Sequence, residues 1–111
     1  VLDCTGIGIP VLLKSEGMLK KYKSDEELLN IFKETAEKTG IKCQTQELPI
    51  GYTEMEVIKN FGFKVITIGA APENPEEVPN WHQITDTVKY IEPQSLENIY
   101  KLLIYTIESI K

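Results

Sequence analysis

The sequence predicts an α/β fold in which helices flank a mixed sheet. Short apolar runs bounded by Gly or Pro alternate along the chain with stretches whose apolar residues recur at helical spacing. The chain has 111 residues, the usual size of one domain, and its 41% of hydrophobic residues suffice for one core. We therefore expect residues 1–111 to form one domain.

The first part of the chain predicts two strands and a helix. Residues 1–4 form a short apolar run that leads into a Gly-rich turn, and residues 9–13 form a second apolar run. Ser24 followed by Glu27 has the form of a capping box, and apolar residues at helical spacing come next. This pattern predicts a helix over residues 25–39.

The middle of the chain predicts a strand, a short helix and a buried strand. Residues 41–48 alternate with a period of two, which is typical of a strand with one solvated face. Thr53 and Glu56 form a second capping box, and the helix that they introduce closes at Gly62. The β-branched run 63–68 then predicts a strand in the interior of the sheet.

The last part of the chain predicts a long loop and a long helix. Residues 70–81 hold three prolines among acidic residues and form neither a helix nor a strand by pattern. A helix is expected to start near Pro93. Its predicted buried stripe consists of Leu96, Ile99, Tyr100, Leu103, Ile107 and Ile110.

Composition excludes several classes of partner. All twelve basic residues are lysines and the net charge is −5, so the chain lacks the arginines that usually grip phosphates and bases, and we expect no nucleic acid partner. No apolar run approaches the roughly 18 residues that span a bilayer, so we expect no membrane partner. Two cysteines are too few for a disulfide scaffold, which favours a reducing, cytoplasmic location.

Three polar residues are candidates for a functional site. Asp3 ends the first apolar run, at a sheet edge where α/β folds often place ligands, although an aspartate there can also merely cap a turn. His82 is the one histidine and follows Trp81, and a lone histidine is more often structural than functional. Asp86, four residues later, is placed to accept a hydrogen bond from the imidazole or to cap the local turn.

Several short motifs together resemble metallopeptidase family twenty-eight, the co-catalytic zinc aminopeptidases, which have glutaminyl cyclases as relatives. The motifs are Leu2-Asp3-Cys4-Thr5-Gly6, Gly51-Tyr52-Thr53-Glu54, the run from Trp81 to Thr87, and Ile91-Glu92-Pro93-Gln94-Ser95-Leu96. The resemblance covers nearly the whole chain and implies a zinc-exopeptidase-like fold. It implies a peptide as substrate and N-terminal residues as the product released.

The resemblance also implies roles for individual residues. Asp3 is expected to bind one of two zinc ions and His82 the other, while Tyr52 is expected to donate a hydrogen bond to the substrate. The family's remaining ligands and its catalytic glutamate come from upstream sequence that this chain lacks. The chain also begins in the middle of a strand, without Met, so we expect it to be part of a longer protein and inactive alone.

Two alternatives to the aminopeptidase remain open at this stage. One is a non-catalytic binding or interaction domain that keeps the peptidase scaffold without the metal. The other is a glutaminyl cyclase-like acyltransferase, because relatives of that kind also have Trp before His, as Trp81 and His82 do here. Because half of the sheet is expected to be missing, we also expect association through an exposed sheet edge, either self-association or binding of the missing segment. We expect Cys4 to be buried as a small hydrophobic residue.

Overall fold

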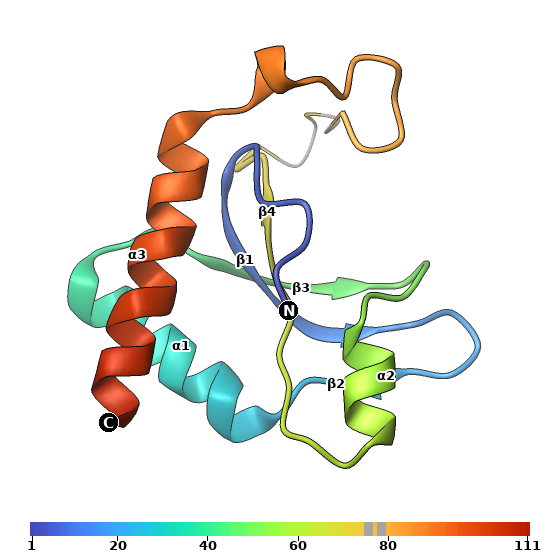
Figure 1. Ribbon diagram of the computed structural model, residues 1–111, viewed down its shortest axis with the longest axis vertical. Helices are drawn as coiled ribbons and strands as arrows, with labels where there is room; N and C mark the ends of the chain where they lie inside the picture. The colour runs from blue at the N-terminus through green and yellow to red at the C-terminus, as the bar shows by residue number, and fades with distance from the viewer. Residues whose placement is uncertain (75–76, 78–79) are drawn as a thin grey trace.

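The computed structural model describes residues 1–74, 77 and 80–111, and it confirms an α/β fold with a mixed sheet flanked by helices (Figure 1). The elements in chain order are β1 (Ile9–Glu16), β2 (Tyr22–Lys23), α1 (Glu26–Thr39), β3 (Gln44–Leu48), α2 (Met55–Asn60), β4 (Ile68–Ala71), the 3-10 turn η1 (Val88–Tyr90) and α3 (Pro93–Ile110).

β1 is the central strand of the sheet. β3 pairs with β1 in parallel on one side. β4 and β2 pair with β1 in antiparallel orientation, β4 along its first half and β2 at its last two residues. The parallel register between β1 and β3 shifts between Leu13 and Ser15, which marks a bulge in β1. A bulge turns the side chains that follow it toward the other face of the sheet.

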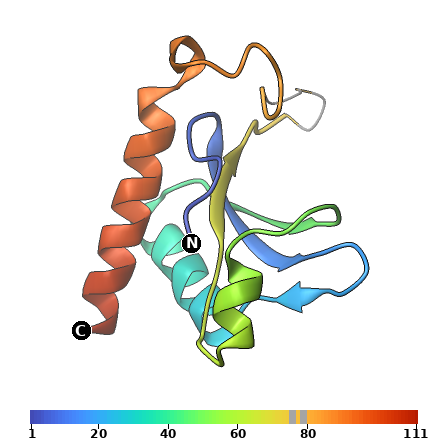
Figure 2. The same cartoon turned by 45° about the vertical axis from the view of Figure 1, so that its right-hand side comes forward.

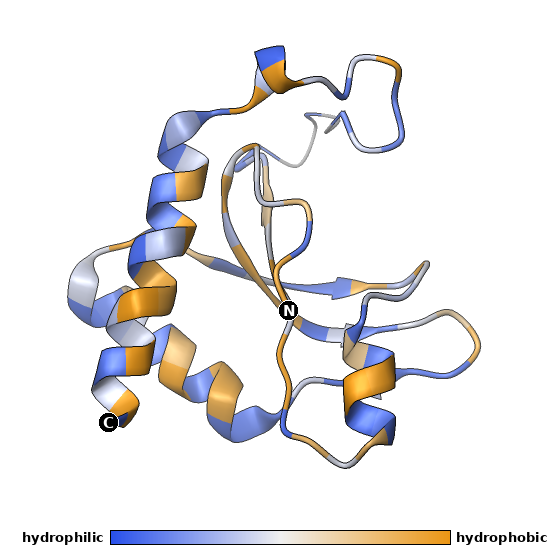
Figure 3. Cartoon of the chain, in the orientation of Figure 1, coloured by the Kyte–Doolittle hydropathy of each residue, from blue (hydrophilic) through white to orange (hydrophobic). Residues whose placement is uncertain are grey.

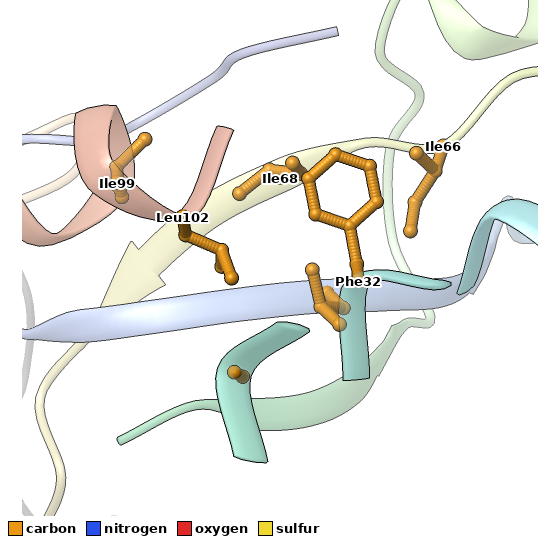
Figure 4. Close-up of a cluster of buried hydrophobic side chains, with 7 residues drawn as sticks. Phe32, Ile66, Ile68, Ile99 and Leu102 are labelled. Atoms are coloured by element: carbon orange, nitrogen blue, oxygen red, sulfur yellow. The ribbon is translucent and has the colours of Figure 1, made fainter. Parts of the chain in front are cut away.

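α1 and α3 cover one face of the sheet and form the main core with it (Figures 1 and 2). Side chains from both helices and from the strands point toward one another in this cluster (Figure 4). Its buried members are Leu12, Phe32, Ala36, Ile66, Ile68, Ile99 and Leu102. The opposite face carries no helix over Val11 and Leu13, and α2 instead packs near β2 through a small cluster of Tyr22, Met55 and Val65.

Two predicted strands differ from the observed ones. Residues 1–4 form only an isolated parallel bridge, between Leu2 and Ile68. Beside it, the Asp3 N–H donates to the Ile68 carbonyl and the Ala70 N–H donates to the Cys4 carbonyl. The strand predicted over 63–68 is observed as β4, which starts at Ile68, where its ladder with β1 begins; the Leu13 N–H also donates to the Thr67 carbonyl just before it. The predicted burial of its apolar residues from Val65 onward is correct.

Both predicted capping boxes differ in detail. The N-cap of α1 is Asp25, whose carboxylate accepts a hydrogen bond from the Leu28 N–H at 3.0 Å, while Ser24 donates to the Leu13 carbonyl in the sheet. α2 starts at Met55, and the hydroxyl of Thr53 accepts the Met55 N–H at 3.1 Å. Ser24 was therefore wrong as the cap of α1, because the adjacent strand takes its hydroxyl.

The stripe predicted to be buried along α3 is only partly correct. Ile99 is buried, but Leu96, Tyr100, Ile107 and Ile110 are between 44% and 63% exposed. The residues that face the sheet are Ser95, Ile99, Leu102 and Thr106.

The loop predicted over 70–81 starts two residues too early, because Ala70 and Ala71 belong to β4; beyond them the chain has turns and the short η1 among its described residues. Two of its prolines, Pro75 and Pro79, lie outside the described residues. Among the residues that the structure describes, no helix has the length and apolar character to cross a bilayer.

Candidate functional site

A cavity of about 190 Å³ lies on the sheet face that no helix covers. Its floor is formed by β1, β3 and β4, and its rim by the N-terminal segment and the loop before α3. The lining is mostly apolar, with a few polar groups that converge on it, as in small-molecule sites. The polar lining residues are Asp3, Gln46, Thr53 and Thr67, and Trp81 stands at the edge.

A second, smaller hollow of about 100 Å³ adjoins the first. The two share Cys4, Ala70 and Trp81, so the indole of Trp81 stands at the boundary between them. The second hollow is lined on its far side by the loop before α3, through Asn80, Asp86, Thr87, Tyr90 and Ile91. Together the two hollows form one bipartite site between the sheet and this loop.

A buried carboxylate lies behind the floor of the larger cavity. Glu16 is completely buried at the end of β1, and it lies on the same side as Leu13 because the bulge between them reverses the alternation. Its Oε1 accepts the Thr53 backbone N–H at 3.1 Å, and its Oε2 accepts the Thr53 hydroxyl at 2.7 Å. The Thr53 hydroxyl is also 2.9 Å from the hydroxyl of Thr67.

Counting donors fixes the direction of this chain of hydrogen bonds. The Thr53 hydroxyl gives its one proton to Glu16 and already accepts the N–H of Met55. We infer that the hydroxyl of Thr67 donates to Thr53, so that Thr67, 1% exposed, presents to the cavity floor lone pairs for which no hydrogen bond is found among the described residues. The floor is thus set to receive a hydrogen bond from a ligand donor.

Asp3 and Cys4 meet at the mouth of the cavity. The Cys4 thiol donates to Asp3 Oδ1 at 3.3 Å. Desolvation, the hydrogen bond to Asp3 and the negative charges of Asp3 and Asp86 raise the pKa of the Cys4 thiol to about 11. Cys4 is exposed, so its prediction as a core residue was wrong; the backbone there has φ of 52° and turns the side chain outward.

Asp86 and His82 do not form the predicted pair. Among the described residues, the carboxylate of Asp86 has no hydrogen bond to the imidazole, and the Asp86 N–H donates to the Gln83 carbonyl in a turn. The ring of His82 instead stacks on Trp81, with centroids 4.0 Å apart. The structure therefore brings Asp3, Trp81 and Asp86 to the bipartite site, while His82 lines neither hollow.

Tyr52 lies at a different place, at the tip of the sheet. Its ring packs edge-on against Tyr22 with centroids 5.9 Å apart, and its hydroxyl donates to the Lys20 carbonyl at 3.4 Å.

Within the described parts of the chain, no three His, Cys, Asp or Glu side chains gather where they could hold a metal ion. Zinc ligation by Asp3 and His82, and substrate binding by Tyr52, stay predictions.

Sequence reasoning missed the buried hydrogen-bond chain of Glu16, Thr53 and Thr67. The sequence carried no clear signal for Glu16, which follows the polar residues Lys14 and Ser15 and precedes Gly17, as a solvated residue near a turn would. The partners could not be found from the sequence, because Thr53 and Thr67 come from segments 37 and 51 positions away and were assigned to a helix cap and a strand.

Comparison with known proteins gives a fold and no family. No protein-family model matches the sequence, and no curated protein matches it. The structure is similar to 5'-methylthioadenosine/S-adenosyl homocysteine nucleosidase from Campylobacter jejuni, with a TM-score of 0.64 and 12% sequence identity. The match covers 93% of this chain and 62% of the nucleosidase chain, so this chain spans less than two thirds of that protein. At this identity the likeness shows the fold alone.

This finding corrects the resemblance drawn from the motifs. The assignment to the zinc aminopeptidases was wrong, and so was the peptidase function. The two alternatives, a peptidase-like binding domain without metal and a glutaminyl cyclase-like acyltransferase, were wrong with it. The motifs also have a local explanation: Pro93 occupies the first position of α3, and residues 81–87 form consecutive turns. Patterns of this kind occur wherever a chain turns into a helix, so they indicated local structure rather than ancestry.

Proposed function

We propose that this domain binds an uncharged purine nucleoside in the bipartite site. The observation that carries the proposal is the indole of Trp81 at the boundary of two adjoining hollows, one of which has Asp3 at its mouth. Each hollow is smaller than the roughly 300–1,000 Å³ of common ligand clefts, so each suits one part of a ligand. A nucleoside has two such parts, a flat base and a sugar.

The chemistry of the lining supports each part of this ligand. An indole offers an aromatic face for stacking on a nucleobase. A carboxylate such as that of Asp3 accepts hydrogen bonds from ribose hydroxyls. The acceptor lone pairs of Thr67 at the floor suit an N–H or O–H donor of the ligand. The nucleosidase of similar fold is named for two adenosine derivatives, which makes adenosine and its 5'-thioethers the first ligands to test.

The charge of the site favours a nucleoside over a nucleotide. Asp3 and Asp86 both act on the Cys4 thiol, so two negative charges lie within electrostatic reach of one point in the site. The chain as a whole carries a net charge of −5. A phosphate group would meet this negative potential without an arginine to pair with it.

Titration calorimetry with adenosine, 5'-methylthioadenosine and adenosine monophosphate tests the proposal. We expect saturable binding of the two nucleosides and binding of the monophosphate that is weaker by about tenfold or more, as one unscreened repulsive contact would cause. Fluorescence of Trp81, the one tryptophan, should change on binding of the nucleosides. If neither adenosine nor 5'-methylthioadenosine binds at millimolar concentration, the proposal is refuted.

Variants locate the binding in this site. Asp3→Asn should weaken nucleoside binding by about tenfold or more, because hydrogen bonds to charged groups contribute about 1.5–3 kcal/mol. Trp81→Ala should abolish measurable binding. Glu108→Gln removes a similar charge near the end of α3, outside the bipartite site, and should leave the affinity unchanged. Equal effects of Asp3→Asn and Glu108→Gln would place the ligand elsewhere.

A further inference from the structure

A buried carboxylate stands behind the floor of the larger cavity without lining it. Glu16 is the last residue of β1, where the strand changes from hydrophobic to hydrophilic residues, yet its side chain is completely buried (Figure 3). The floor itself holds Thr53 and Thr67, the two residues of its hydrogen-bond chain. Glu16 therefore acts on a ligand in this cavity through their two hydroxyl groups.

We propose that Glu16 is a positioning residue that selects ligands by the direction of their hydrogen bond to the cavity floor. The proposal rests on the nucleoside function proposed above. It assigns the floor contact to a ribose hydroxyl, because the carboxylate of Asp3, a group suited to ribose, stands at the mouth of the same cavity. This hydroxyl donates its proton to Thr67 Oγ1. A group of similar size that only accepts, such as fluorine, is disfavoured there.

The direction follows from the number of protons in the chain of hydrogen bonds. A carboxylate has no proton to give, so both of its oxygens accept from Thr53. The one proton of the Thr53 hydroxyl is therefore directed at Glu16, and this hydroxyl accepts the proton of Thr67 across 2.9 Å. Thr67 has no second proton, so it offers only lone pairs to the cavity.

Burial makes this direction costly to oppose. Thr67 is 1% exposed, so its hydroxyl has little access to water that could compensate a misdirected contact. A ligand acceptor placed against the lone pairs of Thr67 leaves two acceptors facing each other, and a buried polar group without its partner is penalised. A site built to hydrogen-bond a ligand hydroxyl discriminates for this reason against analogues that lack it.

Glu16→Gln should reverse the direction of the whole chain. The amide has the size of the carboxylate, and its oxygen still accepts the Thr53 N–H, which turns its NH2 group toward the Thr53 hydroxyl. The Thr53 hydroxyl then accepts from this amide and from the Met55 N–H, and its own proton goes to Thr67. Thr67 is left with a proton that it donates into the cavity.

Titration calorimetry with adenosine, 2'-fluoro-2'-deoxyadenosine and 3'-fluoro-3'-deoxyadenosine tests the proposal. The wild-type protein should bind at least one fluoro analogue about tenfold or more weakly than adenosine, because that analogue lacks the proton that Thr67 accepts. In Glu16→Gln this preference for the hydroxyl should fall below about twofold or reverse. A preference that arises at Asp3 should not change in this variant, since Asp3 lies outside the chain of hydrogen bonds.

The matched control is Glu47→Gln, the same chemical change at an exposed residue of β3. It should leave the preference for the hydroxyl as it is in the wild-type protein. Thr67→Val removes the floor acceptor and should abolish the preference, whereas Thr67→Ser keeps a hydroxyl and should retain it. A merely structural role of Glu16 would lower the affinity for all three nucleosides alike.

Thr53→Val provides a second way to break the chain, for the case that circular dichroism shows Glu16→Gln to be unfolded. It takes away the acceptor of the Thr67 proton, so the preference for the hydroxyl should again be lost. If no nucleoside binds the wild-type protein, the nucleoside function and this inference are both refuted. If adenosine binds and the preference is the same in the wild-type protein, the chain-breaking variants and Thr67→Val, this inference alone is overturned.

Discussion

The carboxylate of Glu16 accepts two hydrogen bonds from Thr53, one from the backbone N–H at 3.1 Å and one from the hydroxyl at 2.7 Å. Glu16 is completely buried, and no cation among the described residues forms an ion pair with it. A buried carboxylate without a cation is tolerated when hydrogen-bond donors surround it. This pair therefore joins the end of β1 to the start of α2 and sets the floor of the bipartite site.

Removing this carboxylate should destabilise the protein. Glu16→Ala leaves the N–H of Thr53 without its acceptor, which costs about 1–3 kcal/mol, and opens a cavity at a completely buried position, which costs more. We expect a loss of at least about 2 kcal/mol in the free energy of unfolding, measured by urea denaturation. Glu47→Ala, which removes only an exposed ion pair with Lys21, should cost less than about 0.5 kcal/mol. Similar losses in both variants would contradict the assigned role.

The backbone turn before β1 should tolerate no side chain. Gly8 has φ of 92°, and a Cβ there would lie 2.0 Å from the Ala71 carbonyl oxygen at the end of β4. Gly62 has a similar φ of 83° but open space around it. Gly62→Ala should cost about 1–2 kcal/mol, the strain of this conformation alone. Gly8→Ala should cost clearly more, because backbone must also move, and thermal denaturation of the two variants compares them directly.

The structure shows which parts of this molecule local sequence can predict. α1 and α3 were located correctly because caps, Pro93 and Gly40 act within a few residues. The bulge that reorients Glu16 was not predictable, since it depends on the register with β3, which lies nearly thirty residues further along. Which side of α3 is buried depends likewise on where the sheet lies, and the apolar pattern alone did not distinguish the core side from the exposed side of Tyr100 and Ile107.

Two of the polar residues singled out from the sequence lie at the bipartite site, and their roles there stay predictions. Asp3 and Asp86 were chosen as polar residues beside turns, and the fold does bring both to the bipartite site. The chemistry assigned to them rested on short motifs instead, and the fold is similar to that of a nucleosidase and not to that of a zinc peptidase. Trp81 was noted only as the neighbour of His82, yet it is one of the three residues that both hollows share, with Cys4 and Ala70.

The charge of Asp3 should control the reactivity of Cys4. Desolvation raises the pKa of the Cys4 thiol most, and the hydrogen bond and negative charge of Asp3 add to it, so all three disfavour the thiolate, which is the reactive form. In a Cys43→Ser background, Asp3→Asn should therefore speed alkylation of Cys4 by iodoacetamide severalfold at pH 8, followed by mass spectrometry. Asp86→Asn should have a smaller effect in the same direction, because it acts on the thiol by charge alone. Glu108→Gln should leave the rate unchanged, and a rate independent of Asp3 would contradict the contact.

The thiol of Cys43 should make stability depend on pH in the alkaline range. Burial raises the pKa of Cys43 from 9.0 to about 11, and the half-buried side chain packs against the main core. A raised pKa means that the folded chain holds its proton more tightly than the unfolded chain. The stabilisation that the protonated Cys43 thiol contributes is fully present below about pH 9 and is lost as the pH rises toward 11.

Urea denaturation at pH 8, 9, 10 and 11, in a Cys4→Ala background under reducing conditions, tests this. The free energy of unfolding should decline more steeply with pH when Cys43 is present than in Cys43→Ala. Comparing the shapes of the two curves cancels the titration of lysines and tyrosines, which both proteins share. Parallel curves would mean that the thiol is solvated in the folded chain, and Cys43 would then lie outside the core in solution.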